Sequence, residues 1–371
     1  MIKFIQGNCV NKIKDLEDNS IDCVISSPPY FGLRDYGTAQ WYGGNPTCNH
    51  KVGRFEYKVS KKQSSNQASA GHQAREKCPK CNAKRIDEQF GLEKTYHDYL
   101  ANTVKVFETF KPKLKDTATI WWNVGDSYHN YRPTNNKQGM YKKPDYPKQS
   151  IAGNRQDLPK HSLKRNQRYQ EIKEKDLMMI PNRVAIALQD AGWYIRSEII
   201  WHKPNPMPES VRDRPTSAHE KIWLITKNKK YYYNADAIKE NSIYAPNKTH
   251  EKERPKGYYK GKWSSPEKGS RHDGSFKAIR EKRNKRNVWT VTTKPFKEAH
   301  FATFPKDLIE PCIKAGCPEN GIVLDPFGGA GTTGIVAKSL NRQCILIELN
   351  PEYIKIAKKR ADKEFGLFNE S

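Results

Sequence analysis

The chain has 371 residues, of which 66 are Lys or Arg and 41 are Asp or Glu, so its formal net charge is +25. This length suits one large α/β domain with insertions, and the positive excess favours a polyanion such as nucleic acid as the partner. No apolar run approaches the roughly 18 residues of a membrane helix. Residues 1–4 begin no signal peptide, so we expect a cytoplasmic protein whose eight cysteines stay reduced or bind a metal.

The first predicted strands lead to a proline turn. Residues 3–5 and 21–25 have the composition of buried strands, and a short helix is predicted between them. Ser27-Pro28-Pro29-Tyr30 must end the second strand, because proline cannot donate a ladder hydrogen bond. The turn directs a hydroxyl, backbone carbonyls and an aromatic ring beyond the carboxyl edge of the sheet, where open α/β sheets bind ligands. These groups suit a planar ring that bears an amino group, and an ordinary surface turn is the alternative.

A polar insertion at residues 38–90 interrupts the α/β pattern. Cys48 and His50 lie towards one end of it, and Cys78 and Cys81 lie towards the other. Two close ligand pairs can complete a tetrahedral site, and four nitrogen and sulfur ligands favour zinc. We predict a structural zinc ion that stabilises an insertion with little core of its own. The alternatives are His72 as a ligand in place of His50, free thiols, and a redox pair.

The middle of the chain alternates predicted core elements with basic polar stretches. A helix is predicted at residues 96–110, and a strand is predicted at residues 118–124. Residues 128–175 have little apolar periodicity and form either a basic arm that contacts DNA or a solvated loop. A helix and two strands follow, at residues 181–191, 193–201 and 222–226. The proline-rich loop between these two strands supplies three candidates for phosphate or base contacts: Lys203, Arg212 and Arg214.

A glycine-rich loop follows the strand predicted at residues 322–324. Glycines allow a ligand to approach the backbone, and the helix predicted after the loop offers free N–H groups. Glu348 ends the next strand, at the spacing from which an acidic residue binds a ribose diol. The loop lacks the G-x-G-x-x-G spacing and the phosphate-binding Lys, so S-adenosylmethionine fits better than NAD or ATP. The predicted cofactor residues of this region are Asp325, Pro326, Phe327, Gly329, Gly331, Thr332, Thr333 and Glu348.

The two motifs together resemble those of amino-group DNA methyltransferases. Ser27 to Tyr30 is similar to the catalytic motif of that family, and residues 325–333 are similar to its S-adenosylmethionine motif. The catalytic motif comes first, which resembles the circularly permuted order often called beta. The resemblance places Asn8 near the cofactor adenine, where family members usually have an acidic residue. It also places a target-recognition region at residues 240–297, and an additional cofactor helix at residues 301–315.

The resemblance implies a doubly wound, mostly parallel, Rossmann-like α/β sheet in a single methyltransferase domain spanning residues 1–371. It implies methyl transfer from S-adenosylmethionine to the exocyclic amino group of a base flipped out of double-stranded DNA, with Ser27, Pro28, Pro29 and Tyr30 as the catalytic residues. Serine at the first motif position favours cytosine N4 over adenine N6. The recognition sequence, a restriction endonuclease partner, and the choice between monomer and homodimer stay open.

Two other classes of protein compete with this interpretation. One is the protein or small-molecule N-methyltransferases. Those that act on glutamine also use a Pro-Pro-Tyr turn, but the class usually places the cofactor motif first and is less basic. A zinc-containing DNA-binding protein without activity would not need an intact turn and glycine loop. Pro311-Cys312 resembles the nucleophile of cytosine-C5 enzymes, but its position in a predicted helix indicates a buried core cysteine.

Overall fold

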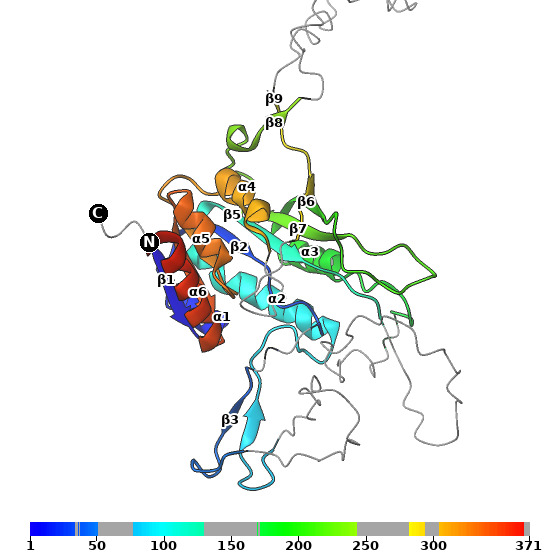
Figure 1. Ribbon diagram of the computed structural model, residues 1–371, viewed down its shortest axis with the longest axis vertical. Helices are drawn as coiled ribbons and strands as arrows, with labels where there is room; N and C mark the ends of the chain where they lie inside the picture. Colours follow the sequence, from blue (N-terminus) through cyan, green and yellow to red (C-terminus); the bar gives the residue numbers. More distant parts are fainter. Residues whose placement is uncertain are drawn as a thin grey trace, which may run out of the picture.

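The computed structural model describes residues 1–33, 36, 38–50, 77–129, 169, 171–242, 282–293 and 304–366. Its centre is one eight-stranded sheet, in the order β1-β12-β11-β2-β5-β7-β6-β10 (Figure 1). In chain order, these strands are β1 Ile2–Gln6, β2 Ile21–Ser26, β5 Leu114–Val124, β6 Tyr194–His202, β7 His219–Thr226, β10 Val288–Thr290, β11 Ile322–Asp325 and β12 Gln343–Glu348.

Most neighbouring strands of the sheet are parallel. The five strands from β1 to β5 run in one direction, β7 runs antiparallel to both β5 and β6, and β10 is parallel to β6. The two motif strands are direct neighbours, since Val24 of β2 pairs with Leu324 of β11. Their carboxyl ends therefore meet at one edge of the sheet, which is the arrangement that a shared site needs.

Helices cover both faces of the sheet, as a doubly wound fold requires. One hydrophobic core lies under α1 Cys9–Lys14, α2 Tyr96–Phe110 and α3 Ile180–Asp190. The other lies under α4 Lys306–Gly316 and α5 Thr332–Ser339, with α6 Pro351–Phe365 beside α5. Cys312 of α4 is 1% exposed in the second core, which confirms its prediction as a core cysteine. None of the helices in the described ranges is both long and apolar enough to span a bilayer.

The predicted core elements agree with these bounds to within a few residues, apart from two strands. Residues 222–226 belong to a strand that begins at His219, so Glu220 lies on β7 and not in the preceding loop. The strand predicted at residues 118–124 begins at Leu114. Residues 301–303 of the additional helix lie outside the described ranges, and the helix itself begins at Lys306.

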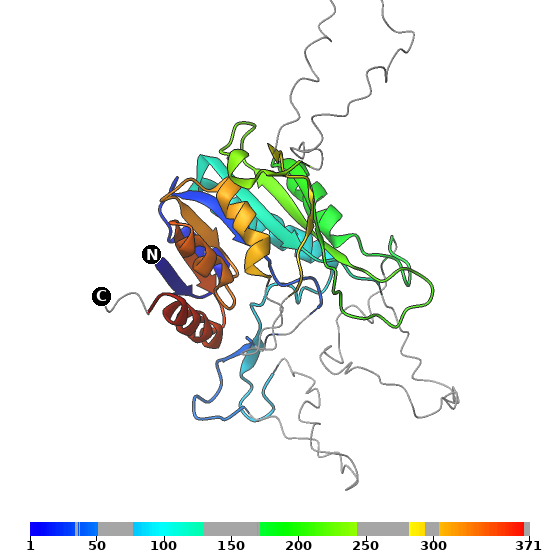
Figure 2. The same cartoon turned by 45° about the horizontal axis from the view of Figure 1, so that its top comes forward.

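Two small antiparallel hairpins lie outside the central sheet. β3 Gln40–Tyr42 pairs with β4 Lys84–Ile86 in a ribbon that projects from the body in both views (Figures 1 and 2). β8 Glu240–Asn241 pairs with β9 Lys282–Arg283 at the opposite end of the molecule. Most of the arm predicted at 128–175 and residues 243–281 of the predicted recognition region lie outside the described residues. Val288–Thr290 of that region forms β10, an edge strand of the central sheet.

Candidate active site and metal cluster

A buried carboxylate joins the two motif strands. Asp325, at the end of β11, is 1% exposed and accepts a hydrogen bond from Ser26 Oγ of β2 at 2.6 Å. It also accepts bonds from Thr333 Oγ1 of α5 at 2.6 Å and from Phe327 N at 3.0 Å. Burial raises the pKa of Asp325 to about 6, although all three donors lower it. The side chain therefore fixes the proline turn, the glycine loop and α5 relative to one another.

The glycine loop follows this carboxylate. Gly331, the residue before α5, has φ +79°, and a Cβ there would lie 2.8 Å from Ala357 Cβ of α6. Gly329 has φ +47°, and a Cβ there would have no neighbour closer than 3.9 Å. The amide of Gly329 donates to Glu348 Oε2 at 2.8 Å, and Asn350 N donates to Glu348 Oε1 at 2.8 Å. Burial raises the pKa of Glu348. Gly331 thus serves helix packing, whereas Gly329 and Glu348 line a neighbouring cavity.

A cavity of about 580 Å³ opens beside this loop. Its volume lies within the roughly 300–1,000 Å³ typical of small-molecule sites. Of the described residues that line it, only Lys105 of α2 is basic, whereas five are acidic: Asp87, Glu88, Glu93, Asp325 and Glu348. Such a lining disfavours phosphate groups and favours a cationic ligand with hydroxyl groups. This charge pattern contrasts with the net charge of +25 for the whole chain.

The residues after β4 form one wall of the cavity. Thr38, before β3, donates from Oγ1 to Asp87 at 3.0 Å, and Tyr36 N donates to Gln89 Oε1 at 2.6 Å. Phe90 packs against Phe327 of the glycine loop, with ring centroids 5.2 Å apart. All these residues line the cavity. The residues at the base of the projecting ribbon therefore form part of the cavity wall. The sequence did not indicate that the ribbon and the cavity are joined in this way.

The proline turn also contributes to the cavity lining and is closely packed. Gly91 has φ +91°, and a Cβ there would lie 2.9 Å from Tyr30 O and 3.0 Å from Pro29 O. A Cβ on Gly125 would lie 2.5 Å from Cε2 of the Tyr30 ring. Tyr99 Oη donates to Pro29 O at 3.3 Å. Two close approaches to glycine thus fix the backbone and the ring of Tyr30.

A polar cluster surrounds the hydroxyl of Tyr30. Ser27 Oγ donates to Tyr30 Oη at 3.1 Å, and Tyr30 Oη donates to Glu220 Oε2 at 2.6 Å. Asn123 Nδ2, at the end of β5, donates to Tyr30 Oη at 2.7 Å and to Glu220 Oε2 at 2.9 Å. Lys203 forms an ion pair with Glu220. Burial, followed by the negative charge of Glu220, raises the pKa of Tyr30 well above its usual value, so the phenol keeps its proton.

Sequence reasoning missed Asn123 and Glu220. Both lie at the edge of the sheet that carries the site: Asn123 is near the carboxyl end of β5, and Glu220 is near the amino end of β7. The sequence predicts only a strand at Asn123 and a loop at Glu220. The one available signal is a polar residue at a terminus of a buried strand, and many residues without such a role share it.

The predicted site residues divide into two groups by position. Those that line the cavity are Asn8, Ser27, Pro29, Asp325, Pro326, Phe327, Gly329, Thr332 and Glu348. Pro28, Tyr30, Gly331 and Thr333 are not part of the lining. Asn8 also caps α1, accepting from Val10 N at 2.9 Å. Thr333 is fully buried and bonded to Asp325, so it supports the loop and does not face a ligand.

The three residues predicted to contact DNA lie in different surroundings. Lys203 is mostly buried against Glu220, with its Nζ 4.3 Å from the ring centroid of Trp201. Arg214 bonds to Glu209 Oε2 at 2.7 Å and lies over the ring of Tyr128. Arg212 is exposed. The first two side chains are thus committed to contacts within the protein, and Arg212 alone of the three presents an exposed guanidinium.

The four predicted metal ligands gather at the tip of the ribbon. The ligand atoms of Cys48, His50, Cys78 and Cys81 all lie within 4.8 Å of one another. Cys48 Sγ lies 3.9 Å from Cys78 Sγ, and Cys81 Sγ lies 3.5 Å from His50 Nδ1. In a tetrahedral zinc site with bonds of about 2.3 Å to sulfur, ligand atoms are about 3.8 Å apart. A hydrogen bond from His50 is the main cause that lowers the pKa of Cys78, to about 6, which favours the thiolate that binds metals.

Comparison with known proteins identifies the class of protein as a DNA methyltransferase that acts on amino groups. The N6/N4 DNA methylase family model matches residues 21–359 of the chain. Type II methyltransferase M.Cfr9I of Citrobacter freundii is 37% identical over 97% of this chain and 88% of its own length. Type II methyltransferase M.SmaI of Serratia marcescens is 35% identical over 96% of this chain and 90% of its own length.

A solved structure described as PvuII DNA methyltransferase (cytosine-N4-specific) shares the fold. Its TM-score is 0.53 at 15% identity, over 99% of this chain and 91% of that one. Together with the family match, the relatives show that the chain belongs to the N6/N4 DNA methylase family. It is an S-adenosylmethionine-dependent DNA methyltransferase of the amino-group class, which excludes the two competing classes considered from sequence.

The glycine loop makes a prediction about stability. Gly331→Ala should lower the free energy of unfolding by about 2–4 kcal/mol, because it adds a left-handed alanine and a clash with α6. Gly329→Ala is the matched control and should cost only about 1–2 kcal/mol, since its Cβ has open space. Urea unfolding of the two variants measures the difference. Equal losses would contradict the packing role of Gly331.

Proposed function

We propose that this protein methylates the exocyclic amino group of a base flipped out of double-stranded DNA at a specific site, with cytosine N4 as the target and adenine N6 as the alternative. The observation that carries the proposal is the position of Ser27, which both lines the acidic cavity and begins the proline turn. A ligand in the cavity and a base on the turn would therefore meet at one hydroxyl. The serine at this position supports cytosine N4, as in the family pattern described above. The catalytic motif precedes the cofactor motif in the chain, which supports the permuted order.

The cavity supports S-adenosylmethionine as the cofactor. Glu348 ends β12, where a carboxylate can bind a ribose diol, and its two oxygens are held by backbone amides. Asn8 offers an amide to the adenine edge, and Phe327 and Phe90 offer apolar surface. The acidic lining suits the sulfonium and ammonium charges of this cofactor. When bound, the cofactor supplies an electrophilic methyl carbon.

The proline turn would bind and orient the base. The amino nitrogen would take the methyl group that the bound cofactor supplies, and it would lose one proton to solvent. Ser27 and the carbonyl of Pro28 accept hydrogen bonds from the amino group, which localises the nitrogen lone pair towards the methyl carbon. Tyr30 supplies an aromatic face for the base. Positioning and electrostatic preorganisation provide most of the rate enhancement, without a covalent nucleophile.

Glu220 is a positioning residue in this scheme. Tyr30 donates its only hydroxyl proton to Glu220, so Tyr30 must accept from Ser27. The proton of Ser27 is then directed towards Tyr30, and a lone pair of Ser27 remains for the amino group of the base. Asn123 accounts for one further lone pair of the Tyr30 oxygen. The chain from Glu220 through Tyr30 therefore determines which way the Ser27 hydroxyl points.

The group of four candidate ligands, Cys48, His50, Cys78 and Cys81, supports one bound structural zinc ion. The ligand spacing fits a closed tetrahedral site, in which no position is left for a substrate. Trp41 stacks on His50, with ring centroids 5.1 Å apart. Gly44 has φ +74°, and a Cβ there would lie 2.8 Å from Cys81 Sγ. The backbone beside Cys81 therefore needs glycine at this position.

The relatives are described as Type II methyltransferases of bacteria, which supports a restriction–modification role. In that setting, a restriction endonuclease of the same sequence specificity would be the functional partner, and the enzyme would act on DNA in the cytoplasm.

The identity of the methylated base tests the proposed function. DNA from cells that express the protein should contain N4-methylcytosine at one short sequence, found by sequencing and by mass spectrometry of nucleosides. N6-methyladenine alone would transfer the assignment to the alternative base. DNA without either modification, from cells in which folded protein is present, would overturn the function.

The positioning role of Glu220 predicts a separation of kinetic constants. Glu220→Gln keeps the shape but loses the charge, and it should lower kcat roughly 10²-fold through misorientation of Ser27. The KM for S-adenosylmethionine should stay within about twofold. Glu198→Gln is the matched control, because it breaks the neighbouring Lys221–Glu198 pair of 2.5 Å outside the cluster. An unchanged kcat in Glu220→Gln would show that Ser27 is oriented without it.

The zinc assignment predicts about one zinc ion per chain in purified protein, measured by mass spectrometry of the elements. Cys78→Ser should lose most of the metal, whereas Cys312→Ser, in the second hydrophobic core, should keep it. Folded wild-type protein with no bound metal would refute the assignment.

A further inference from the structure

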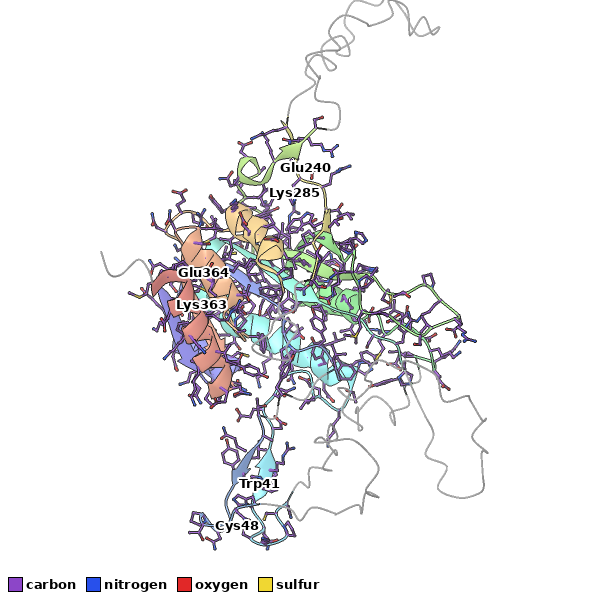
Figure 3. The ribbon with its side chains drawn as sticks, in the orientation of Figure 1. Trp41, Cys48, Glu240, Lys285, Lys363 and Glu364 are labelled. Atoms are coloured by element: carbon purple, nitrogen blue, oxygen red, sulfur yellow. The ribbon has the colours of Figure 1, made fainter. Side chains whose placement is uncertain are left out.

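We propose that the ribbon formed by β3 and β4 is a DNA-contacting arm that enters the major groove beside the target base. This inference rests on the proposed function and adds a binding surface to it. The ribbon is the two strands with the metal cluster at their tip, residues 39–50 and 77–86. Figure 3 shows Trp41 and Cys48 on it, well away from the labelled residues of α6 and β8.

The charge of the ribbon favours a polyanion. The described ribbon residues include four basic side chains and no acidic one: Lys77, Lys80, Lys84 and Arg85. The three lysines are exposed. A charged surface that is merely solvated usually mixes both signs, as α6 does with Glu352, Asp362 and Glu364 among its lysines. An exposed face of a single sign is the electrostatic pattern of phosphate binding.

The shape of the ribbon selects duplex DNA among polyanions. The major groove admits a two-stranded β-ribbon, whereas the deep, narrow groove of duplex RNA does not. Tyr42 and Lys84 are paired in register and thus lie on one face, and Trp41 and Arg85 are paired in the same way on the other. Tyr42 is 46% exposed. Polar and aromatic side chains are thus available to a groove on the face that carries Tyr42 and Lys84.

The position of the ribbon makes contact with the substrate geometrically reasonable. Thr38 precedes β3 and Asp87 directly follows β4, and both residues line the cavity that Ser27 also lines. A duplex that delivers a base to Ser27 must approach this edge of the sheet, so it comes alongside the ribbon. A two-stranded hairpin is only marginally stable alone in water. A zinc ion bound by the four ligands at the tip would give the ribbon the rigidity that groove binding needs.

The salt dependence of DNA binding tests the ribbon directly. The variant Lys77→Gln, Lys80→Gln, Lys84→Gln removes three charges from the ribbon. The matched control Lys358→Gln, Lys359→Gln, Lys363→Gln removes three exposed charges from α6. Each variant and the wild type are titrated against a duplex oligonucleotide that carries the unmethylated target site. Binding is measured by fluorescence anisotropy from 50 to 300 mM NaCl.

Each phosphate contact contributes about −0.9 to the slope of log K against log salt, so the ribbon variant should lose up to about 2.7 of that slope. Its affinity at 100 mM salt should fall about 10-fold or more, whereas the control should stay within about threefold. Its kcat at saturating DNA and its affinity for S-adenosylmethionine should be unchanged, because the lysines do not line the cavity.

The outcomes separate this inference from the proposed function. Suppose that the wild type methylates DNA. If the slope of log K against log salt then falls equally in the two variants, or falls in neither, the ribbon is not a DNA arm. A ribbon variant that keeps full affinity for DNA would leave a protein partner as the occupant of this surface and would also overturn the inference. If the wild type neither binds nor methylates the duplex, the proposed function fails, and the ribbon proposal fails with it.

Discussion

The hydrogen bond between Ser26 and Asp325 is the interaction on which the geometry of both sites depends. It joins residues 299 positions apart at the ends of neighbouring strands. A carboxylate buried at 1% exposure costs free energy unless it is fully bonded, and three donors provide that compensation here. Because the same carboxylate holds Thr333, the start of α5 and the glycine loop cannot shift without disturbing β2. Under the proposed function, the distance between a cofactor in the cavity and a base on the turn would therefore be fixed by the core, and methyl transfer depends strongly on such a distance.

Charge is distributed unevenly between the chain as a whole and its cavity. The chain carries a net charge of +25, yet the described residues that line the cavity include five acids and one lysine. A polyanion is therefore attracted to the chain but disfavoured in the cavity, where a cation is favoured. Under the proposed function, DNA and S-adenosylmethionine would then not compete for one surface. The charge of Lys203 is directed inwards, because its ion pair with Glu220 makes it part of the interior polar cluster.

The sequence revealed those parts of the fold and site that local constraints determine. Two successive prolines end a strand because they cannot donate ladder hydrogen bonds, so the turn was predictable. A glycine-rich loop between a strand and a helix is typical of a ligand-binding loop, so the loop was predictable as well. The family resemblance was then confirmed by the family match. Gly329 and Gly331 look equivalent in sequence, yet only the position of Ala357 shows that one faces open space and the other faces a helix. Glu220 lies 190 positions from Tyr30, and no periodicity connects a residue on an antiparallel strand to a turn on a parallel one.

The antiparallel β7 explains why the site contains Glu220 at all. Parallel strands deliver only their carboxyl ends to the ligand-binding edge, so each contributes residues from its end or from the following loop. A strand that runs in the opposite direction delivers its amino end to the same edge. His219 begins β7 beside the end of β6, and Glu220 therefore faces the hydroxyl of Tyr30 across Asn123 of β5. One reversed strand thus supplies Glu220 on the β5 side of the turn, and this residue anchors the tyrosine from the side opposite the cofactor motif.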